Sequence, residues 1–282
     1  MLIDGAQRFD ANGSAEDWVP TDPRERLELE RAQLHGLVGA PLHPDVAVNL
    51  RGERVATQKA LLALKPRRLI AYRNDGVPET EGGPTWCAEE YEVQKWCRLL
   101  AAHGIPADAH DLHFTPHSTP DADRMRGATV IHPGAGSPAR LWPVERWVQV
   151  AVSERRRGRS VVITGGPGEA ELAEEIRRGA GLAREDVLAE RTGVMELAAI
   201  VSAAGRVVCP DTGVAHLAVA VGTPSVTLFG PMPPLRWGPP AHLTHHRVLW
   251  ARQTGEPYAA EPDEGLLRIS AQDVINALRG LD

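Results

Sequence analysis

Short apolar runs alternate with amphipathic segments along the chain from residue 128 onward. The amphipathic segments carry apolar residues at helical spacing and several end in glycine, which is typical of helices. This alternation predicts β-α-β units, in which helices cover both faces of a parallel sheet. The expected strands are 128–132, 160–166, 186–193, 206–213 and 224–230, and the expected helices are 142–158, 168–181, 194–205 and 214–222.

The first 120 residues show the same pattern less completely. Before residue 45 only 21–36 is helical in character, and 105–127, rich in Pro, Asp and His, is expected to be a linker. The sequence therefore predicts an α/β fold with two Rossmann-like domains, 1–120 and 121–282, of which the N-terminal one is incomplete. Within that domain the expected strands are 44–52 and 67–73, and the expected helices are 57–65 and 87–104.

Composition narrows the class of protein. The 282 residues are 43% hydrophobic and 24% charged with a net charge of -6, which disfavours a general nucleic-acid binder. A basic run at 154–159 is interpreted as a solvated helix end, with a peripheral contact to an anionic surface as the alternative. Three cysteines without a CxxC pair, no signal-peptide pattern and no apolar run of about 18 residues favour a cytoplasmic protein without a membrane span.

Right-handed crossovers place the loops that follow parallel strands at one sheet edge, where ligands bind. The first such loop is HPGAGSPAR at 132–140. Its glycines let backbone amides approach an anion, while Ser137 adds a hydroxyl and Arg140 a fixed charge, so it predicts a phosphate site. The alternative is a glycine-rich turn beside a surface arginine.

The second loop is TGGPGEAE, which begins with Thr164 and Gly165. Glu169 or Glu171 could accept hydrogen bonds from two ribose hydroxyls, although acidic residues also favour the first turn of any helix. The third loop leads into Met195 and Leu197, which could cover a nucleotide base or simply belong to the core. Neither loop contains a GxGxxG dinucleotide fingerprint.

The fourth loop is DTGVAH at 211–216. Thr212 and Gly213 open a helix whose first N–H groups point outward without partners. Asp211 could simply cap that helix, and His216 could be a core histidine. Four loops suited to phosphate at one edge nevertheless make a stronger case together than any one alone.

The remaining histidines do not indicate a metal site. Pro116 interrupts the near-helical spacing of His110, His113 and His117, and no carboxylate pattern accompanies them. His242, His245 and His246 are expected to be surface-loop residues, and no P-loop, GxSxG or HExxH motif occurs.

The order of the four loops resembles glycosyltransferase family 9, the heptosyltransferase-like enzymes. The likeness spans about residues 128–240 and rests on HPGAGSPARLWPVERW, VVITGGPGE, RTGVMELAAIVSAA and VVCPDTGVAHLAVAVGTPSVTLFGP. A looser likeness upstream, through AVNLRG and LLALKPRRLIAYR, looks like the later part of the family's acceptor domain. The resemblance implies a GT-B architecture, in which two Rossmann-like domains face each other and the C-terminal one binds a nucleotide sugar.

The resemblance also implies inverting transfer without a divalent metal or other cofactor, because protein groups neutralise the departing diphosphate. Ser137 and Arg140 would contact that diphosphate, with arginine standing where the family commonly has lysine. Glu169 would hold the ribose, and Met195 with Leu197 would flank the base. The other donor-binding residues implied are Thr164, Gly165, Asp211, Thr212, Gly213 and His216.

The start of the chain departs from the family pattern. Family members begin with a strand and a glycine-rich loop whose Gly-Asp aspartate is the expected base, whereas this chain opens MLIDGAQRFDANGS. Asp4 is the candidate base, and an N-terminal truncation would explain the poor match. Loss of a general base would slow transfer by about 10²–10⁴-fold.

The sequence thus predicts a glycosyltransferase that uses a nucleotide-diphosphate sugar, with ADP-heptose as the first candidate donor. The expected acceptor is a cell-envelope glycan or another hydroxyl compound. The alternative is a non-catalytic nucleotide-sugar-binding protein that has lost its acceptor half. A third possibility, a nucleotide-sugar epimerase of similar fold, would release product without an acceptor.

Overall fold

The computed structural model describes residues 43–282, together with two short strands nearer the N-terminus. Those strands, β1 (Arg8–Phe9) and β2 (Ala15–Glu16), pair antiparallel. The chain divides into two compact units, Met1–Ala109 and His110–Asp282. The boundary between them along the chain falls within the expected linker. Asp4 and the expected helix at 21–36 lie outside the described residues.

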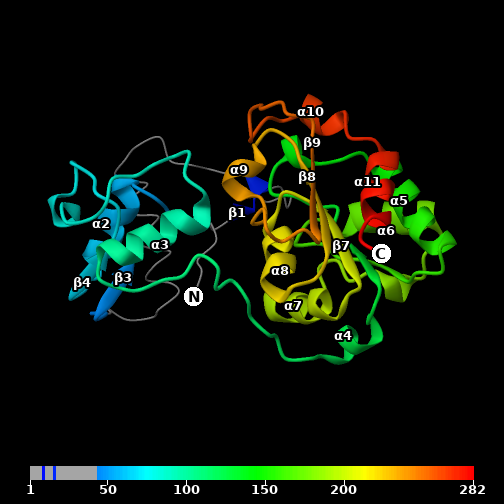
Figure 1. Ribbon diagram of the computed structural model, residues 1–282, viewed down its shortest axis with the longest axis horizontal. Helices are drawn as coiled ribbons and strands as arrows, with labels where there is room; N and C mark the ends of the chain where they lie inside the picture. Colours follow the sequence, from blue (N-terminus) through cyan, green and yellow to red (C-terminus); the bar gives the residue numbers. More distant parts are fainter. Residues whose placement is uncertain (1–7, 10–14, 17–42) are drawn as a thin grey trace. The chain divides into compact units, whose positions relative to one another are not determined.

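The first unit contains a small parallel sheet and two longer helices, as the pattern predicted (Figure 1). Strands β3 (Val46–Val48) and β4 (Arg68–Ile70) flank helix α2 (Val55–Ala63) in the chain. Helix α3 (Glu92–Ala102) begins five residues later than expected, because the chain forms a turn before Tyr91. It ends at Ala102, close to the predicted end at Gly104, which adopts a left-handed φ of 75° that a glycine tolerates best.

The second unit is built on a five-stranded parallel sheet with the order β6-β5-β7-β8-β9. Its strands are β5 (Thr129–Ile131), β6 (Val161–Ile163), β7 (Arg206–Pro210), β8 (Ser225–Phe229) and β9 (His246–Trp250). The longer helices are α5 (Val144–Arg156), α6 (Ala170–Ala180), α7 (Val194–Ala203), α8 (Gly213–Val221) and α11 (Ala271–Arg279). Short helices are α4 (Pro120–Arg124), α9 (Pro234–Trp237) and α10 (Glu264–Leu267).

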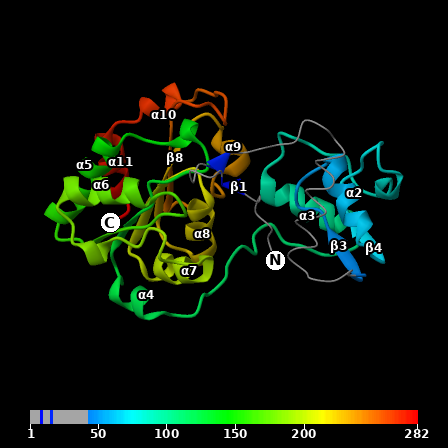
Figure 2. The ribbon, with the colours of Figure 1, turned by 180° about the vertical axis from the view of Figure 1, so that it is seen from behind.

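Helices cover both faces of this sheet, as the sequence predicted (Figures 1 and 2). Successive residues of a strand point to opposite faces, so each strand contributes to two cores. Ile131, Ile163 and Val208 pack with α5, α6 and α11 on one face. Their neighbours along the strands pack with α4, α7 and α8 on the other; these are Val130, Val162, Val207 and Cys209.

Two expectations for this unit are wrong. Segment 186–193 is not a strand: Val187 forms an isolated bridge to Ile163, and the N–H groups of Leu188 and Glu190 donate to the carbonyls of Ile163 and Gly165. A 3-10 turn at Arg184–Asp186 precedes that bridge and Glu190 follows at a left-handed φ of 59°, so the extended stretch is too short to form a strand. The fifth strand is instead β9, whose first residue His246 is buried rather than part of a surface loop.

Candidate functional site

The reversal of strand order between β5 and β7 defines the candidate site. Chain connections leave β5 toward β6 on one side and β7 toward β8 on the other, so the loops after β5 and β7 diverge. Ligands of open α/β sheets bind in the crevice that such a divergence creates. Arg140 links the two loops, because its Nη1 donates a hydrogen bond to the carbonyl oxygen of Asp211 at 3.0 Å. The first and fourth predicted loops therefore lie together.

The first loop orients Arg140 through a short 3-10 turn at Pro138–Arg140. Buried Ser137 starts the turn, and its Oγ accepts a hydrogen bond from the N–H of Ala139 at 3.3 Å. The Nε of Arg140 is buried and has no hydrogen-bond partner among the described residues. Because a buried N–H without an acceptor is costly, this donor is suited to an anionic ligand.

The fourth loop presents the start of α8 without a side-chain cap. Thr212 occupies the N-cap position, yet neither its hydroxyl nor the Asp211 carboxylate caps the helix among the described contacts. The described contacts of α8 therefore give no support to the alternative interpretation of Asp211 as a helix cap. The first N–H groups of α8 remain available to an anion, and the helix dipole favours one there.

Asp211 itself is buried near Arg140 and His216. Burial raises the pKa of its carboxyl, while Arg140 and the neighbouring His216 oppose that rise. The Asp211 carboxylate thus lies near both Arg140 and the start of α8. Its negative charge would repel a bound phosphate and so partly offset the attraction of Arg140 and the helix dipole. The arrangement keeps Arg140 in place before any ligand arrives.

The second loop packs against the first. The His132 Nδ1 lies 3.0 Å from the Thr164 Oγ1, and both residues are buried, Thr164 completely. The Glu169 Oε2 accepts a hydrogen bond from the N–H of Gly166 at 2.6 Å and lies 3.8 Å from the His132 Nε2. Burial raises the pKa of Glu169 and lowers that of His132 to about 4.

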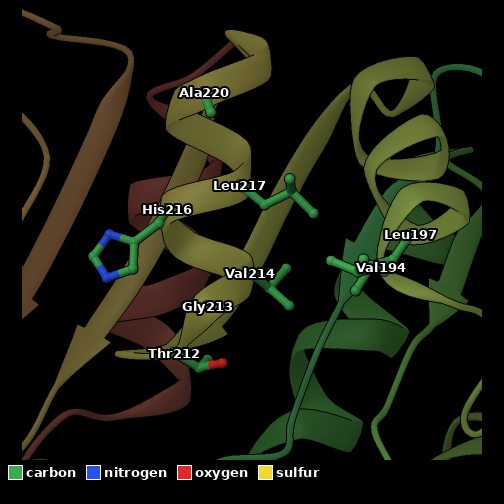
Figure 3. Close-up of a pocket in the computed structure, with 8 residues that line it drawn as sticks. All are labelled: Val194, Leu197, Thr212, Gly213, Val214, His216, Leu217 and Ala220. Atoms are coloured by element: carbon green, nitrogen blue, oxygen red, sulfur yellow. The ribbon is translucent and has the colours of Figure 1, made fainter. Parts of the chain in front are cut away.

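An apolar pocket of about 400 Å³ lies between the first turn of α7 and the side of α8 that runs from Gly213 to Ala220. Figure 3 shows Val214 and Leu217 of α8 pointing toward Val194 and Leu197 of α7, with Thr212 at the pocket's end. His216 also lines the pocket, although its ring points away from Val194 and Leu197 and its centroid is 6.0 Å from that of Trp237. Met195, predicted to lie on the base, is exposed and does not line this pocket.

Sequence reasoning missed three contributors to this edge of the sheet: His132, Val194 and Leu217. The position of His132 directly after a buried strand was a usable signal, because such positions reach the ligand-binding edge. Val194 and Leu217 carry only apolar side chains, and nothing in their local sequence separates a pocket wall from a core position.

The burial of His132 predicts acid sensitivity. The folded protein keeps the imidazole neutral down to a pKa of about 4, whereas the unfolded chain binds a proton below about 6.5. Because the unfolded state binds more protons in that window, stability is lost as pH falls through it. Between pH 7 and pH 5, His132 should account for a loss of about 2 kcal/mol in the free energy of unfolding.

Urea denaturation of the wild type and of His132→Gln at the two pH values measures this contribution. The variant should lose distinctly less stability than the wild type on acidification. Equal losses in the two proteins would show that His132 is not held neutral by the fold.

The described residues hold no group of three or more His, Cys, Asp or Glu side chains placed to bind a metal ion. Within the same part of the chain, no helix is long and apolar enough to cross a membrane.

The fold is that of the GT-B heptosyltransferases. Escherichia coli ADP-heptose lipopolysaccharide heptosyltransferase II matches with a TM-score of 0.68 and 20% identity, over 91% of this chain and 81% of that chain. Escherichia coli heptosyltransferase WaaC with ADP matches with a TM-score of 0.63 and 17% identity, over 94% and 80%. These matches confirm the predicted α/β class.

The model of glycosyltransferase family 9 (heptosyltransferase) matches residues 88–260, and the chain belongs to this family. Lipopolysaccharide heptosyltransferase 3 of Escherichia coli K12 is 34% identical over 112 residues, which are 39% of this chain and 33% of that protein. Lipopolysaccharide heptosyltransferase 1 of Pseudomonas aeruginosa is 32% identical over 148 residues, 51% and 41% respectively. The matched regions thus span about a third to two fifths of these relatives' own length.

Proposed function

We propose that the protein transfers a sugar from a nucleoside-diphosphate sugar to a hydroxyl of a cell-envelope glycan, with heptose from ADP-heptose as the donor sugar. The observation that carries this proposal is the link between Arg140 and the loop that opens α8. A guanidinium and an uncapped helix end lie together at the strand-order reversal of a family 9 domain. Family membership and the names of the relatives support the choice of heptose.

The reaction proposed is a single displacement that inverts the sugar's anomeric centre. The leaving nucleoside diphosphate gains negative charge as the glycosidic bond breaks, so fixed donors stabilise the transition state more than the ground state. Arg140 and the first N–H groups of α8 supply these donors, and we propose that they neutralise the diphosphate without a divalent ion. The general base stays unassigned within the described residues, because the candidate Asp4 lies outside them.

The donor's other parts are assigned from the neighbouring loops. We place the ribose at Glu169 and the base between the second loop and the apolar pocket of α7 and α8. We propose that the acceptor binds to the unit at 1–109, which bears a looser likeness to the family than the donor-binding loops do. The free thiols of Cys87, Cys97 and Cys209 support a proposed location in the cytoplasm, where thiols are kept reduced.

Turnover by the purified full-length chain tests the proposal. ADP-heptose and a lipopolysaccharide core fragment should give steady release of ADP and an acceptor that is heavier by one heptose, as measured by mass spectrometry. The control omits the acceptor, and donor consumption without it would indicate hydrolysis or epimerisation instead of transfer. Donor binding with no ADP release would support the non-catalytic alternative, and parallel assays with UDP- and GDP-sugars would identify the nucleoside.

A further inference from the structure

The Glu169 carboxylate packs closely against the backbone of glycines from two loops. A Cβ added to Gly134 would lie 1.9 Å from the Glu169 carboxyl carbon and 2.0 Å from each of its oxygens. A Cβ on Gly165 would lie 3.2 Å from the Oε2, and the N–H of Gly166 donates to that oxygen at 2.6 Å. The glycines of two different loops therefore leave room for one carboxylate.

His132 lies beside the Glu169 carboxylate, and its ring is hydrogen-bonded to Thr164. The burial of its imidazole keeps the ring neutral, so one ring nitrogen donates and the other accepts. Its Nε2 faces the Glu169 Oε2 at 3.8 Å, and a carboxylate only accepts, which favours the tautomer with the proton on Nε2. The Nδ1 then accepts from the buried Thr164 hydroxyl at 3.0 Å.

The two oxygens of Glu169 differ in their surroundings. The Oε2 is anchored by Gly166 and faces His132, whereas no hydrogen bond of the Oε1 is found among the described residues. The side chain keeps 21% of its surface exposed, so the carboxylate is fixed on one side and open on the other. Burial raises the pKa of this carboxyl, and the negative charge of Glu190 raises it further.

We infer that His132 and Thr164 are positioning residues, which together with Gly134 hold the Glu169 carboxylate ready for the ribose hydroxyls of the nucleotide. This inference rests on the proposed function, since it assumes a ribonucleoside diphosphate as ligand. Thr164 then acts through His132 rather than on the donor, which agrees with its complete burial. A carboxylate fixed before binding loses less side-chain freedom when the ligand arrives, and affinity rises accordingly.

The ratio of the affinities for ADP and for 2′,3′-dideoxy-ADP isolates this role. Both ligands carry the same base and diphosphate, so the ratio reports only the ribose hydroxyls. Calorimetry on the wild type should give at least a tenfold preference for ADP, since hydrogen bonds to a charged group contribute about 1.5–3 kcal/mol. His132→Phe, Thr164→Val and Gly134→Ala should each reduce that preference to about twofold.

Two matched variants serve as controls. Thr164→Ser keeps the hydroxyl and should restore the preference. Gly136→Ala adds a Cβ in the same loop, but its nearest neighbour is the Arg140 Nη2 at 3.4 Å. It should therefore change both affinities alike and leave the ratio intact. An unchanged ratio in His132→Phe and Thr164→Val, or equal wild-type affinities for the two nucleotides, would overturn the inference.

A measurement without ligand separates this inference from the proposed function. The ¹⁵N shifts of the His132 ring should report a neutral imidazole with its proton on Nε2, and Glu169→Gln should move the Nε2 resonance. If it does not move, the contact between His132 and Glu169 is absent and the inference fails. If the resonance moves but no nucleoside diphosphate binds, the proposed function fails while the positioning contact stands.

Discussion

Replacing Arg140 with alanine is expected to lower kcat/KM for the nucleotide sugar by about 10²–10³-fold, the effect of removing one preorganised donor from a developing anion. Arg140 joins the loops after β5 and β7 through its bond to the Asp211 carbonyl, and its Nε is buried without a partner among the described residues. Alanine removes both the charge and this link. The affinity for ADP should fall with kcat/KM, because the departing diphosphate uses the same contacts.

Steady-state kinetics with varied donor, together with calorimetry for ADP, measure both effects. Arg140→Lys keeps the charge but loses the planar fork, so it should lie between the wild type and the alanine variant. Arg156→Ala is the matched control, since Arg156 is an exposed arginine in the last turn of α5. An Arg140→Ala protein with unaltered ADP affinity would remove Arg140 from the phosphate site.

The sequence predicted the fold best where burial is continuous. Strands such as Thr129–Ile131 and Val161–Ile163 are buried on both faces, so they read as unbroken apolar runs between helices. Helix ends were also predictable, because Gly181 and Gly222 adopt left-handed conformations after α6 and α8. Local preference and global packing agree at these positions.

Prediction failed where pairing depends on distant partners. Segment 186–193 contains the apolar residues of a strand, yet Glu190 turns the chain away after a single bridge at Val187. β9 starts with two polar residues, His246 and Arg247, and its pairing with β8 decides its structure. Nothing in either local pattern reports which stretch reaches the sheet.

The candidate site was predictable in kind but not in detail. Residues of suitable chemistry follow each strand, and the topology brings Arg140 and the Asp211 loop together as expected. The sequence could not show that Thr164 is buried behind His132, because that contact joins residues 32 positions apart. Side chains that act through another group are therefore the part of a site that a single sequence reveals least.

Trp147→Ala is expected to lower the free energy of unfolding by about 3–5 kcal/mol, the range for removing a large aromatic side chain from a core. Trp147 is completely buried on α5 and packs edge-on against Trp142, with ring centroids 4.7 Å apart. Both tryptophans belong to the core that supports the sheet face under α5, α6 and α11. Urea denaturation followed by circular dichroism measures the loss.

Phenylalanine variants of the two tryptophans separate packing from hydrogen bonding. The indole Nε1 of Trp147 is buried without a partner among the described residues, so Trp147→Phe also removes an unsatisfied donor. The Trp142 Nε1 donates to the Ile269 carbonyl at 3.0 Å, and Trp142→Phe loses that bond. Trp142→Phe should therefore cost about 0.5–1.5 kcal/mol more than Trp147→Phe. If Trp147→Phe proves the more damaging of the two, the Trp147 N–H has a partner in solution, and its aromatic volume alone does not explain its place in the core.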